Sequence, residues 1–356
     1  MNLGQVEKIA EAVLYEGYML YPYRPSSVKN QRRWNFGVLC PPSYCEQQHG
    51  TERDTMQTEV LLRGDSAATL TVKVRFLQII RRSIGKLRFA VSSLAPDAEP
   101  AFDSVERLEV RGRVYQAWQE AVEREIVCDE LQVGALASPI SFPFEFDAHR
   151  EVEPVYGDSG TVVAVIVREW ERVSGSVEIA AARLLDDLDD IVKLRVVIRN
   201  QTPFASVPER RREDAVPFSL VSAHTILGVQ DGRFLSLLEP PLNCESLAAG
   251  CQNVGTWPVL VGEQDSRQAM LSSPIILYDY PQIAPESAGS LFDGTEIDEI
   301  LSLRIMTLTD DEKREMRQSD DRAREILERT ENLPEEQFMK LHGVLRGLHP
   351  MKEEVQ

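Results

Sequence analysis

Residues 161–202 read TVVAVIVREWERVSGSVEIAAARLLDDLDDIVKLRVVIRNQT and contain the clearest β-strand signal in the chain. The runs TVVAVIVREWERV, GSVEIAAARL and KLRVVIRNQT are rich in valine and isoleucine and mix apolar with polar side chains at strand spacing. A turn is expected at Ser174-Gly175, and an acidic loop separates the second run from the third. Because no run is followed by a regular crossover helix, the pattern predicts an antiparallel, sandwich-like body rather than a doubly wound sheet.

The two-residue period continues on both sides of this segment. Residues 58–78 predict two strands joined by a tight turn at Asp65-Ser66, and residues 224–241 predict a hairpin that turns at Asp231-Gly232. Further strands are expected at residues 107–115, 116–126, 141–148, 257–262 and 273–280. Strands at such short, turn-punctuated spacing are typical of β-sandwiches.

Helical spacing replaces the strand period at the two ends of the chain. Val6, Ile9 and Val13 lie on one face of a predicted amphipathic N-terminal helix. Thr309 and Glu312 form a capping box at the start of a predicted C-terminal helix, and a final short helix is expected after it. The predicted fold class is therefore mainly β (α+β), an antiparallel β-sandwich-like body with an N-terminal helix and C-terminal helices.

The sequence predicts three regions. Residues 1–207 contain the N-terminal helix, an arm rich in aromatic and basic residues, and a β-sandwich-like region. The charged stretch 208–217 is bracketed by prolines and is a candidate linker. Residues 208–308 then form a second β-rich region with an extended, proline-punctuated arm, and residues 309–356 form a C-terminal helical segment.

Charge and composition argue against several classes of protein. Of the 356 residues, 57 are Asp or Glu and 39 are Lys or Arg, which gives a formal net charge of −18. A field of this sign repels phosphate backbones and anionic lipids, so nucleic acid and membranes are not expected as partners. No apolar run reaches the roughly 18 residues that span a bilayer, and no signal peptide is recognisable. The five cysteines are an odd number and do not suggest a secreted disulfide framework, so a cytoplasmic location is expected.

No complete catalytic motif is present in the sequence. Gly157-Asp158-Ser159-Gly160 matches the nucleophile segment of trypsin-like proteases, but their histidine lies far upstream and His149 is only ten residues away. A turn leading into a strand is therefore predicted for this segment. His224 precedes an apolar strand and is expected to be a structural histidine with satisfied hydrogen bonds. Because Walker and dinucleotide-binding motifs are also absent from the sequence, no catalytic residue and no cofactor are predicted.

Cys40, Cys45 and His49 form the only cluster with a metal-ligand character that the sequence suggests. Their C-x4-C-x3-H spacing supplies three candidate zinc ligands, and Cys244 or Cys251 could complete a tetrahedral site. Pro41-Pro42 stiffens the loop between the two cysteines, and the fourth ligand would come from far away in the sequence. The alternative is that these are incidental, partly buried thiols.

Two segments suggest a protein-binding surface. The first combines aromatic and basic side chains in an otherwise acidic protein, which is the composition of interface hot spots. Its candidate residues are Tyr21, Tyr23, Arg24, Arg32, Arg33 and Trp34. The alternative is an internal arm whose arginines pair with carboxylates of the same chain. The second segment, residues 273–301, is punctuated by proline and contributes Tyr278 and Tyr280 as candidates, although packing within the fold would also explain it.

Three strings in the chain resemble a known family: EAVLYEGYMLYPYRPSSVKNQRRWNFGVL near the start, GTWPVLVG, and SPIILYDYPQIAPES…LFDGTEIDEILSLRIMTLTDDEKREMR. With them the chain resembles a conserved bacterial protein family associated with gene clusters for uptake NiFe hydrogenases. The strings contain no known catalytic residue. The resemblance implies a non-enzymatic accessory, assembly or scaffolding protein whose partner is a hydrogenase subunit or maturation factor. The alternative is a metal-binding protein or an enzyme with an unrecognised site, and a homo-oligomer is left open.

Overall fold

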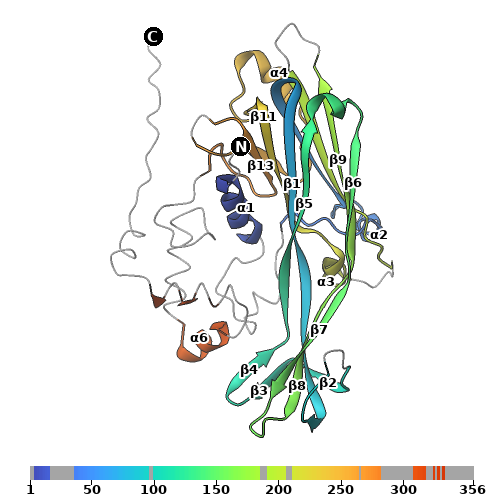
Figure 1. Ribbon diagram of the computed structural model, residues 1–356, viewed down its shortest axis with the longest axis vertical. Helices are drawn as coiled ribbons and strands as arrows, with labels where there is room; N and C mark the ends of the chain where they lie inside the picture. Colours follow the sequence, from blue (N-terminus) through green and yellow to red (C-terminus); the bar gives the residue numbers. More distant parts are fainter. Residues whose placement is uncertain are drawn as a thin grey trace.

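The computed structural model is an elongated, two-lobed β protein (Figure 1). It describes residues 4–16, 36–95, 99–184, 191–205, 211–263, 266–281 and 308–317, together with positions 324, 327, 328, 331 and 332. The larger upper lobe contains the layered sheets, and the smaller lower lobe contains β2, β3, β4 and the ends of the longest strands. A narrow waist of extended chain joins the two lobes.

One strand, β1 (Thr55–Val91), runs through the whole molecule (Figure 1). It has 37 residues, and a straight strand of that length would measure about 120 Å. The chain instead turns a corner at residues 64–69, where its pairing with β11 (Val221–Leu235) shifts from Gly64↔Gly232 to Thr69↔Gln230. The Asp65 carboxylate accepts hydrogen bonds from the amides of Ala67 and Ala68 and so holds this corner.

The corner divides the strands of the upper lobe into two layers. In the first layer, residues 69–77 of β1 pair with β11 on one side and with β5 (Trp118–Gln132) on the other. Strands β13 (Ala269–Ser273) and β12 (Trp257–Leu260) extend this layer beyond β11. In the second layer, residues 55–63 of β1 pair with β10 (Ile191–Asn200), followed by β9 (Val173–Arg183) and β6 (Ile140–Phe146).

The main core lies between these two layers. Phe76 comes from the first layer, yet its ring lies 6.0 Å from the ring of Phe144 and 5.8 Å from that of Phe146, both in the second layer. Met56 and Phe76 belong to the same buried cluster although about twenty residues of β1 separate them. The paired strands are antiparallel throughout the sheet. The predicted mainly β fold with a sandwich-like body is confirmed.

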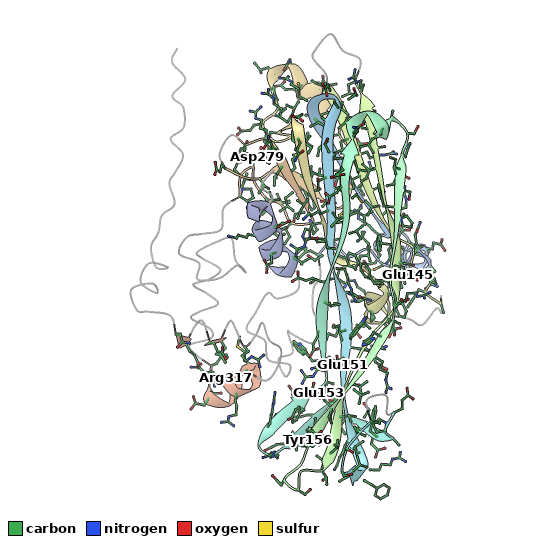
Figure 2. The ribbon with its side chains drawn as sticks, in the orientation of Figure 1. Glu145, Glu151, Glu153, Tyr156, Asp279 and Arg317 are labelled. Carbon is green, nitrogen blue, oxygen red and sulfur yellow. The ribbon has the colours of Figure 1, made fainter. Side chains whose placement is uncertain are left out.

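A second long hairpin runs beside β1 from the upper lobe to the lower one. Strand β6 continues into β7 (His149–Tyr156), and β8 (Val162–Trp170) continues into β9, with one constant register from Ile140↔Ile179 to Val155↔Ala164. Figure 2 shows this course, with Glu145 in the upper lobe, Glu151 and Glu153 at the waist and Tyr156 in the lower lobe. The Gly157–Gly160 segment forms the tip of the hairpin, where Gly160 has a φ of 73°. The predicted turn at this motif is confirmed.

The lower lobe is a sheet that is buried on both faces. Residues 81–86 of β1 pair with β8, and residues 84–87 pair with β2 (Phe102–Val105). On one face, Ile84 and Ile166 are covered by the small hairpin of β3 (Arg107–Val110) and β4 (Arg113–Gln116). On the other face, Leu87 and Val165 are covered by Leu94 and Phe102. Each face of this lobe therefore has its own small core.

Buried charges connect the strands at the waist. The Glu120 carboxylate on β5 accepts hydrogen bonds from Arg82 Nη1 on β1 at 3.1 Å and from Arg168 Nε on β8 at 2.8 Å. Arg168 also donates to Glu153 on β7 at 2.8 Å. The Arg82 side chain is only 8% exposed, so its charge depends on these partners rather than on water. The waist is thus held by a polar network where the chain has too few layers for an apolar core.

The N-terminal helix covers the outer face of the first layer (Figure 1). Helix α1 (Gly4–Glu16) places Val6, Ile9 and Val13 against strands β11, β12 and β13, which confirms the predicted N-terminal helix. Helix α6 (Asp310–Arg317) begins directly after Thr309, as the capping box predicted. The shorter helices are α2 (Pro42–Gln47), α3 (Arg212–Ala215), α4 (Glu245–Ala249), η1 (Val133–Ala137), η2 (Val216–Phe218) and η3 (Leu242–Cys244).

Several predicted turns and strands are wrong, because the pairing of strands is set by the layers and not by local sequence. Asp65-Ser66 and Asp231-Gly232 do not close hairpins but form the corner at which β1 and β11 pass together between layers. Ser174-Gly175 lies inside β9, whose partners are β10 and β6 rather than β8. Ser273 ends β13 and residues 274–280 follow it without forming a strand, and residues 107–115 contain two strands rather than one. Turn-forming residue types at Asp65-Ser66 and Asp231-Gly232 mark a bend of the chain, but which strands pair across it depends on tertiary packing.

Strands on both sides of residue 208 share the same sheet, because β11 pairs with β1 along most of its length. The division into three regions stays a prediction. Among the residues that the model describes, no helix is long and apolar enough to cross a membrane.

Gly175 should tolerate no side chain. A Cβ atom at this position would lie 2.3 Å from the Arg199 carbonyl oxygen and 2.6 Å from the Phe144 ring. We expect Gly175→Ala to lower the free energy of unfolding by about 3 kcal/mol, because backbone and core ring must both move. Gly250→Ala is the matched control, since its nearest neighbours lie at 3.4 Å or more. Denaturant unfolding of both variants tests this, and equal midpoints would contradict it.

Glu120 should be required for the stability of the waist. Glu120→Ala removes the carboxylate to which both Arg82 and Arg168 donate, so we expect a loss of about 3 kcal/mol in the free energy of unfolding. The control is Asp103→Ala, which removes the exposed ion pair with Arg88 and should leave the unfolding midpoint unchanged. Thermal and denaturant unfolding measure the difference. If both variants unfold like the unsubstituted protein, the waist network does not stabilise the fold.

Candidate functional site

The two predicted protein-binding segments differ in how much the structure says about them. Tyr21, Tyr23, Arg24, Arg32, Arg33 and Trp34 lie outside the described residues. Of the second segment, residues 273–281 are described, and they place the two candidate tyrosines differently. Tyr278 is 87% exposed. Tyr280 is partly buried against the main core and has a φ of 56°, so it is part of the packing.

Asp279 anchors this segment to the end of the first layer (Figure 2). Its carboxylate accepts a hydrogen bond from the Leu260 amide at 2.8 Å and another from the Ser236 hydroxyl at 2.5 Å. The Tyr280 amide donates to the Leu260 carbonyl oxygen at 2.7 Å. These bonds join the segment to β12 and to the chain that leaves β11. The backbone around Asp279 is therefore held in one conformation by its own hydrogen bonds.

Three large apolar side chains connected to this anchor face solvent, and we call them the Asp279 surface. They are Leu238, whose amide donates to the Ser236 hydroxyl oxygen, and Ile276 and Tyr278 of the segment itself. The neighbours Ile275 and Leu277 point the other way and pack on the cluster beneath α1, so the exposed side chains alternate with anchoring ones. Ile276 is 70% exposed and Leu238 is 53% exposed. Apolar side chains presented together on a fixed backbone are typical of sites that bind another protein.

Cys40 and Cys45 meet at the start of α2. Pro41 is the N-cap residue of this helix and Pro42 is its first residue, so Cys40 and Cys45 occupy the positions of a hydrophobic staple. The Cys45 amide donates to the Pro41 carbonyl oxygen, and the Cys45 sulfur lies 3.8 Å from the Cys40 carbonyl oxygen. Cys40 is fully buried, whereas Cys45 is partly exposed. The two thiols therefore form a contact pair of which one member is accessible.

Polar groups surround the Cys40 sulfur. It lies 3.7 Å from Glu52 Oε2, and the other oxygen of Glu52 accepts a hydrogen bond from Arg212 Nε at 2.6 Å. The hydrogen bond from the Cys45 thiol lowers the pKa of Cys40, with further help from the Ser219 hydroxyl and Arg212, against burial and Glu52. The same contact and burial raise the pKa of Cys45. Of the two thiols, Cys40 is therefore the one whose deprotonation its neighbours assist.

The structure does not bring His49 to the two thiols as a third ligand. His49 is exposed, with a φ of 50°, at the end of the loop that follows α2. In the described part of the chain, no three His, Cys, Asp or Glu side chains lie close enough together to hold a metal ion. Cys244 and Cys251 belong to a separate cluster beside α4.

A buried polar segment of β11 was not foreseen. His224 is fully buried, and its Nδ1 lies 2.9 Å from the Ser222 carbonyl oxygen, while its Nε2 has no hydrogen-bond partner. The hydroxyls of Ser222 and Thr225 also lack partners, and Ser222 has a φ of 53°. The expectation that His224 is a satisfied structural histidine is therefore wrong for one of its nitrogens. Sequence could not show this, because the neighbours of a strand residue are set by the layers that cover it.

The environment of His224 keeps its imidazole neutral. Burial lowers its pKa to about 4, the hydrogen bond with the Ser222 carbonyl opposes this shift, and the charge of Arg75 adds to it. Arg75 is the residue directly opposite His224 on β1. A proton on His224 would be placed in an apolar interior beside a cation, so folding favours the unprotonated ring.

His224 should make the fold sensitive to acid. Its pKa is lower in the folded chain than the ordinary 6.5, so the stabilisation is complete above pH 6.5 and is lost as the pH falls towards 4. Between pH 7 and pH 5 we expect this group to lower the free energy of unfolding by about 2 kcal/mol. His224→Leu should remove that part of the pH dependence, and His49→Ala, at an exposed position, should retain it. Denaturant unfolding at pH 7 and pH 5 measures this. If His224→Leu loses as much unfolding free energy between the two pH values as the unsubstituted protein does, the prediction is contradicted.

Comparison with known proteins identified no relative of this chain. No family model matches the sequence, and no curated protein matches it. What the chain can bind or do is therefore argued from two local features: the Asp279 surface in the upper lobe and the thiol pair at α2.

Proposed function

We propose that this protein is a non-enzymatic accessory protein that binds a protein partner through the Asp279 surface and acts in assembly or as a scaffold. The observation that supports this most directly is the exposure of Ile276 and Tyr278 on a segment held by Asp279. A side chain that loses water on binding contributes more when its backbone is already ordered, because less conformational entropy is lost. The hydrogen bonds of Asp279 and Tyr280 supply that order.

The form of the molecule supports a binding role as well. Its two lobes lie at opposite ends of a long axis (Figure 1). The upper lobe exposes the Asp279 surface, and the lower lobe exposes Phe89 and Tyr156. An elongated body with apolar side chains at both ends offers separate contacts to one large partner or to two partners.

Two edge strands of the sheet, β6 and β7, are protected against simple strand addition. Edge strand β6 has a proline, Pro143, and an outward Glu145. Edge strand β7 has Glu151 and Glu153 beside Pro154. Charges and prolines on edges oppose pairing with a further strand. Binding through side chains of the Asp279 surface is therefore favoured over binding through these edges.

The partner we propose is a hydrogenase subunit or maturation factor in the cytoplasm. This part of the proposal is supported by the resemblance to the family found with uptake NiFe hydrogenase gene clusters. One of the strings that the resemblance uses, SPIILYDY, contains both exposed residues of the anchored segment, Ile276 and Tyr278. A metal-binding or enzymatic role is the second candidate, and the two adjacent thiols of Cys40 and Cys45 are the feature in its favour.

Substitutions on the Asp279 surface should weaken partner binding without unfolding the protein. The test measures, by biolayer interferometry, how tightly the purified full chain binds individually purified hydrogenase subunits and maturation factors. We expect Ile276→Asp combined with Tyr278→Ala to reduce affinity by at least about tenfold, because an apolar contact is replaced by a desolvated charge. Val127→Ala is the matched control and should retain affinity, since Val127 is 46% exposed but lies on β5, on the other side of β1 from β11, β13 and β12.

Two results would contradict the proposal. If none of these proteins binds the unsubstituted chain, the hydrogenase partner is wrong. If a partner binds and the double variant binds it equally well, the Asp279 surface is not the site. Metal analysis of the same preparation addresses the second candidate, because a stoichiometric metal that is lost in Cys40→Ser would favour it.

A further inference from the structure

We propose that Cys40 and Cys45 are a redox-active dithiol that closes reversibly to an intramolecular disulfide at the start of α2. The inference concerns a different part of the molecule from the Asp279 surface and does not depend on the proposed partner. It rests on the placement of the two sulfurs by the helix start, on the polar groups around Cys40 and on the partial exposure of Cys45.

The helix start holds the two sulfurs together before any reaction. In a staple, the residue before the N-cap packs against the fourth helical residue, and here these residues are Cys40 and Cys45. The segment is anchored on both sides: the Cys40 amide donates to the Arg53 carbonyl oxygen at 2.7 Å, and the Ser43 hydroxyl donates to the Phe204 carbonyl oxygen at 2.8 Å. A disulfide would replace the staple contact by a bond within a six-residue segment. The Cys45 sulfur already lies 3.8 Å from the Cys40 carbonyl oxygen, so the helix start brings it next to Cys40 before any reaction.

Neighbouring groups assist deprotonation of Cys40. The Cys45 thiol and the Ser219 hydroxyl lower the pKa of Cys40, although burial and Glu52 oppose them. Arg212 partly offsets the charge of Glu52 through the ion pair that joins them. Thiolates are the reactive form of cysteine in oxidation and exchange. Cys40 is therefore the member of the pair whose reactive form its neighbours support, and partly exposed Cys45 gives a small oxidant a route to the pair.

The other cysteines lack these features. Burial raises the pKa of Cys128 to about 11 and that of Cys251 to about 11. Cys244 is buried at the start of α4, where its sulfur contacts the Asn243 side chain. These three cysteines serve as internal references for the reactivity of the Cys40–Cys45 pair.

The reaction balances with hydrogen peroxide as the oxidant. The thiolate of the pair attacks one peroxide oxygen and the O–O bond breaks, which gives a sulfenic acid and hydroxide. The second sulfur then attacks the sulfenic sulfur, the S–S bond forms and a second hydroxide leaves. The proton of the second thiol and one from solvent convert the two hydroxides to water. Overall, two thiols lose two electrons and two protons and one peroxide becomes two waters; an added dithiol such as dithiothreitol reverses the change by exchange.

The test uses the purified full chain and peptide mass spectrometry. The reduced protein is treated with increasing hydrogen peroxide, remaining thiols are blocked with iodoacetamide after unfolding, and the protein is digested with trypsin. Both cysteines lie in one tryptic peptide, residues 34–53. We expect this peptide to lose two hydrogens and both blocking groups at peroxide doses on the order of tenfold lower than those that modify Cys128, Cys244 or Cys251. Dithiothreitol should restore both blocking sites.

A variant separates a dithiol from a single reactive cysteine. In Cys45→Ser, the sulfenic acid on Cys40 has no second thiol, so dimedone should label it and excess peroxide should convert it to a form that dithiothreitol does not reduce. Cys251→Ser is the control and should leave the disulfide of residues 34–53 unchanged. The proposal is overturned if Cys40 and Cys45 both stay blockable while the other cysteines are oxidised, or if either one pairs with another cysteine instead. The measurement on the unsubstituted chain decides this even if a variant does not fold.

Discussion

The corner at residues 64–69 of β1 is the constraint on which the rest of the fold depends. Without it, one strand of 37 residues would make a single long sheet with no second layer to bury its apolar face. The two backbones approach closely at the corner, because a Cβ atom added to Gly64 would lie 3.3 Å from the Cα atom of Gly232. Strand β11 turns with β1, with Asp231 at a φ of 57°, so pairing is retained on both sides of the bend. The core that includes Phe76 and Phe144 follows directly from this geometry.

The lower lobe and the waist are consequences of the same strand continuing beyond the sandwich. Where β1 leaves the two layers, its neighbours are single strands. Less apolar surface can therefore be buried at the waist than between the two layers. The network centred on Glu120 joins β1, β5 and β8 there, and Arg168 extends it to β7. A buried pair of this kind is costly to break, although it adds less net stability than an apolar core of equal size. The strands at the waist are therefore joined by specific ion pairs rather than by hydrophobic contact alone.

The two local features with chemical character lie on different elements of the upper lobe. The Asp279 surface belongs to the end of the first layer, where one carboxylate holds the chain and leaves apolar side chains in water. The thiol pair belongs to the start of α2, where a proline N-cap sets the spacing of two cysteines. We propose binding at the first feature and redox chemistry at the second. Because their residues do not overlap, changes at one site should be separable from changes at the other.

From its local patterns the sequence predicted the class of the fold, the N-terminal helix, the start of α6 and the presence of the turn at Gly157–Gly160. Periodicity and capping are local properties, so alternating side chains and a capping box report them without knowledge of the neighbours. It also identified Cys40 with Cys45 and the segment around Tyr278 as unusual. Only the tertiary structure decided which strands pair, why Gly175 lies inside a strand, why Tyr280 packs while Tyr278 is exposed, and why His224 has an unsatisfied nitrogen. These depend on what covers each residue, and that is set by a corner between layers that local turn chemistry cannot distinguish from a hairpin.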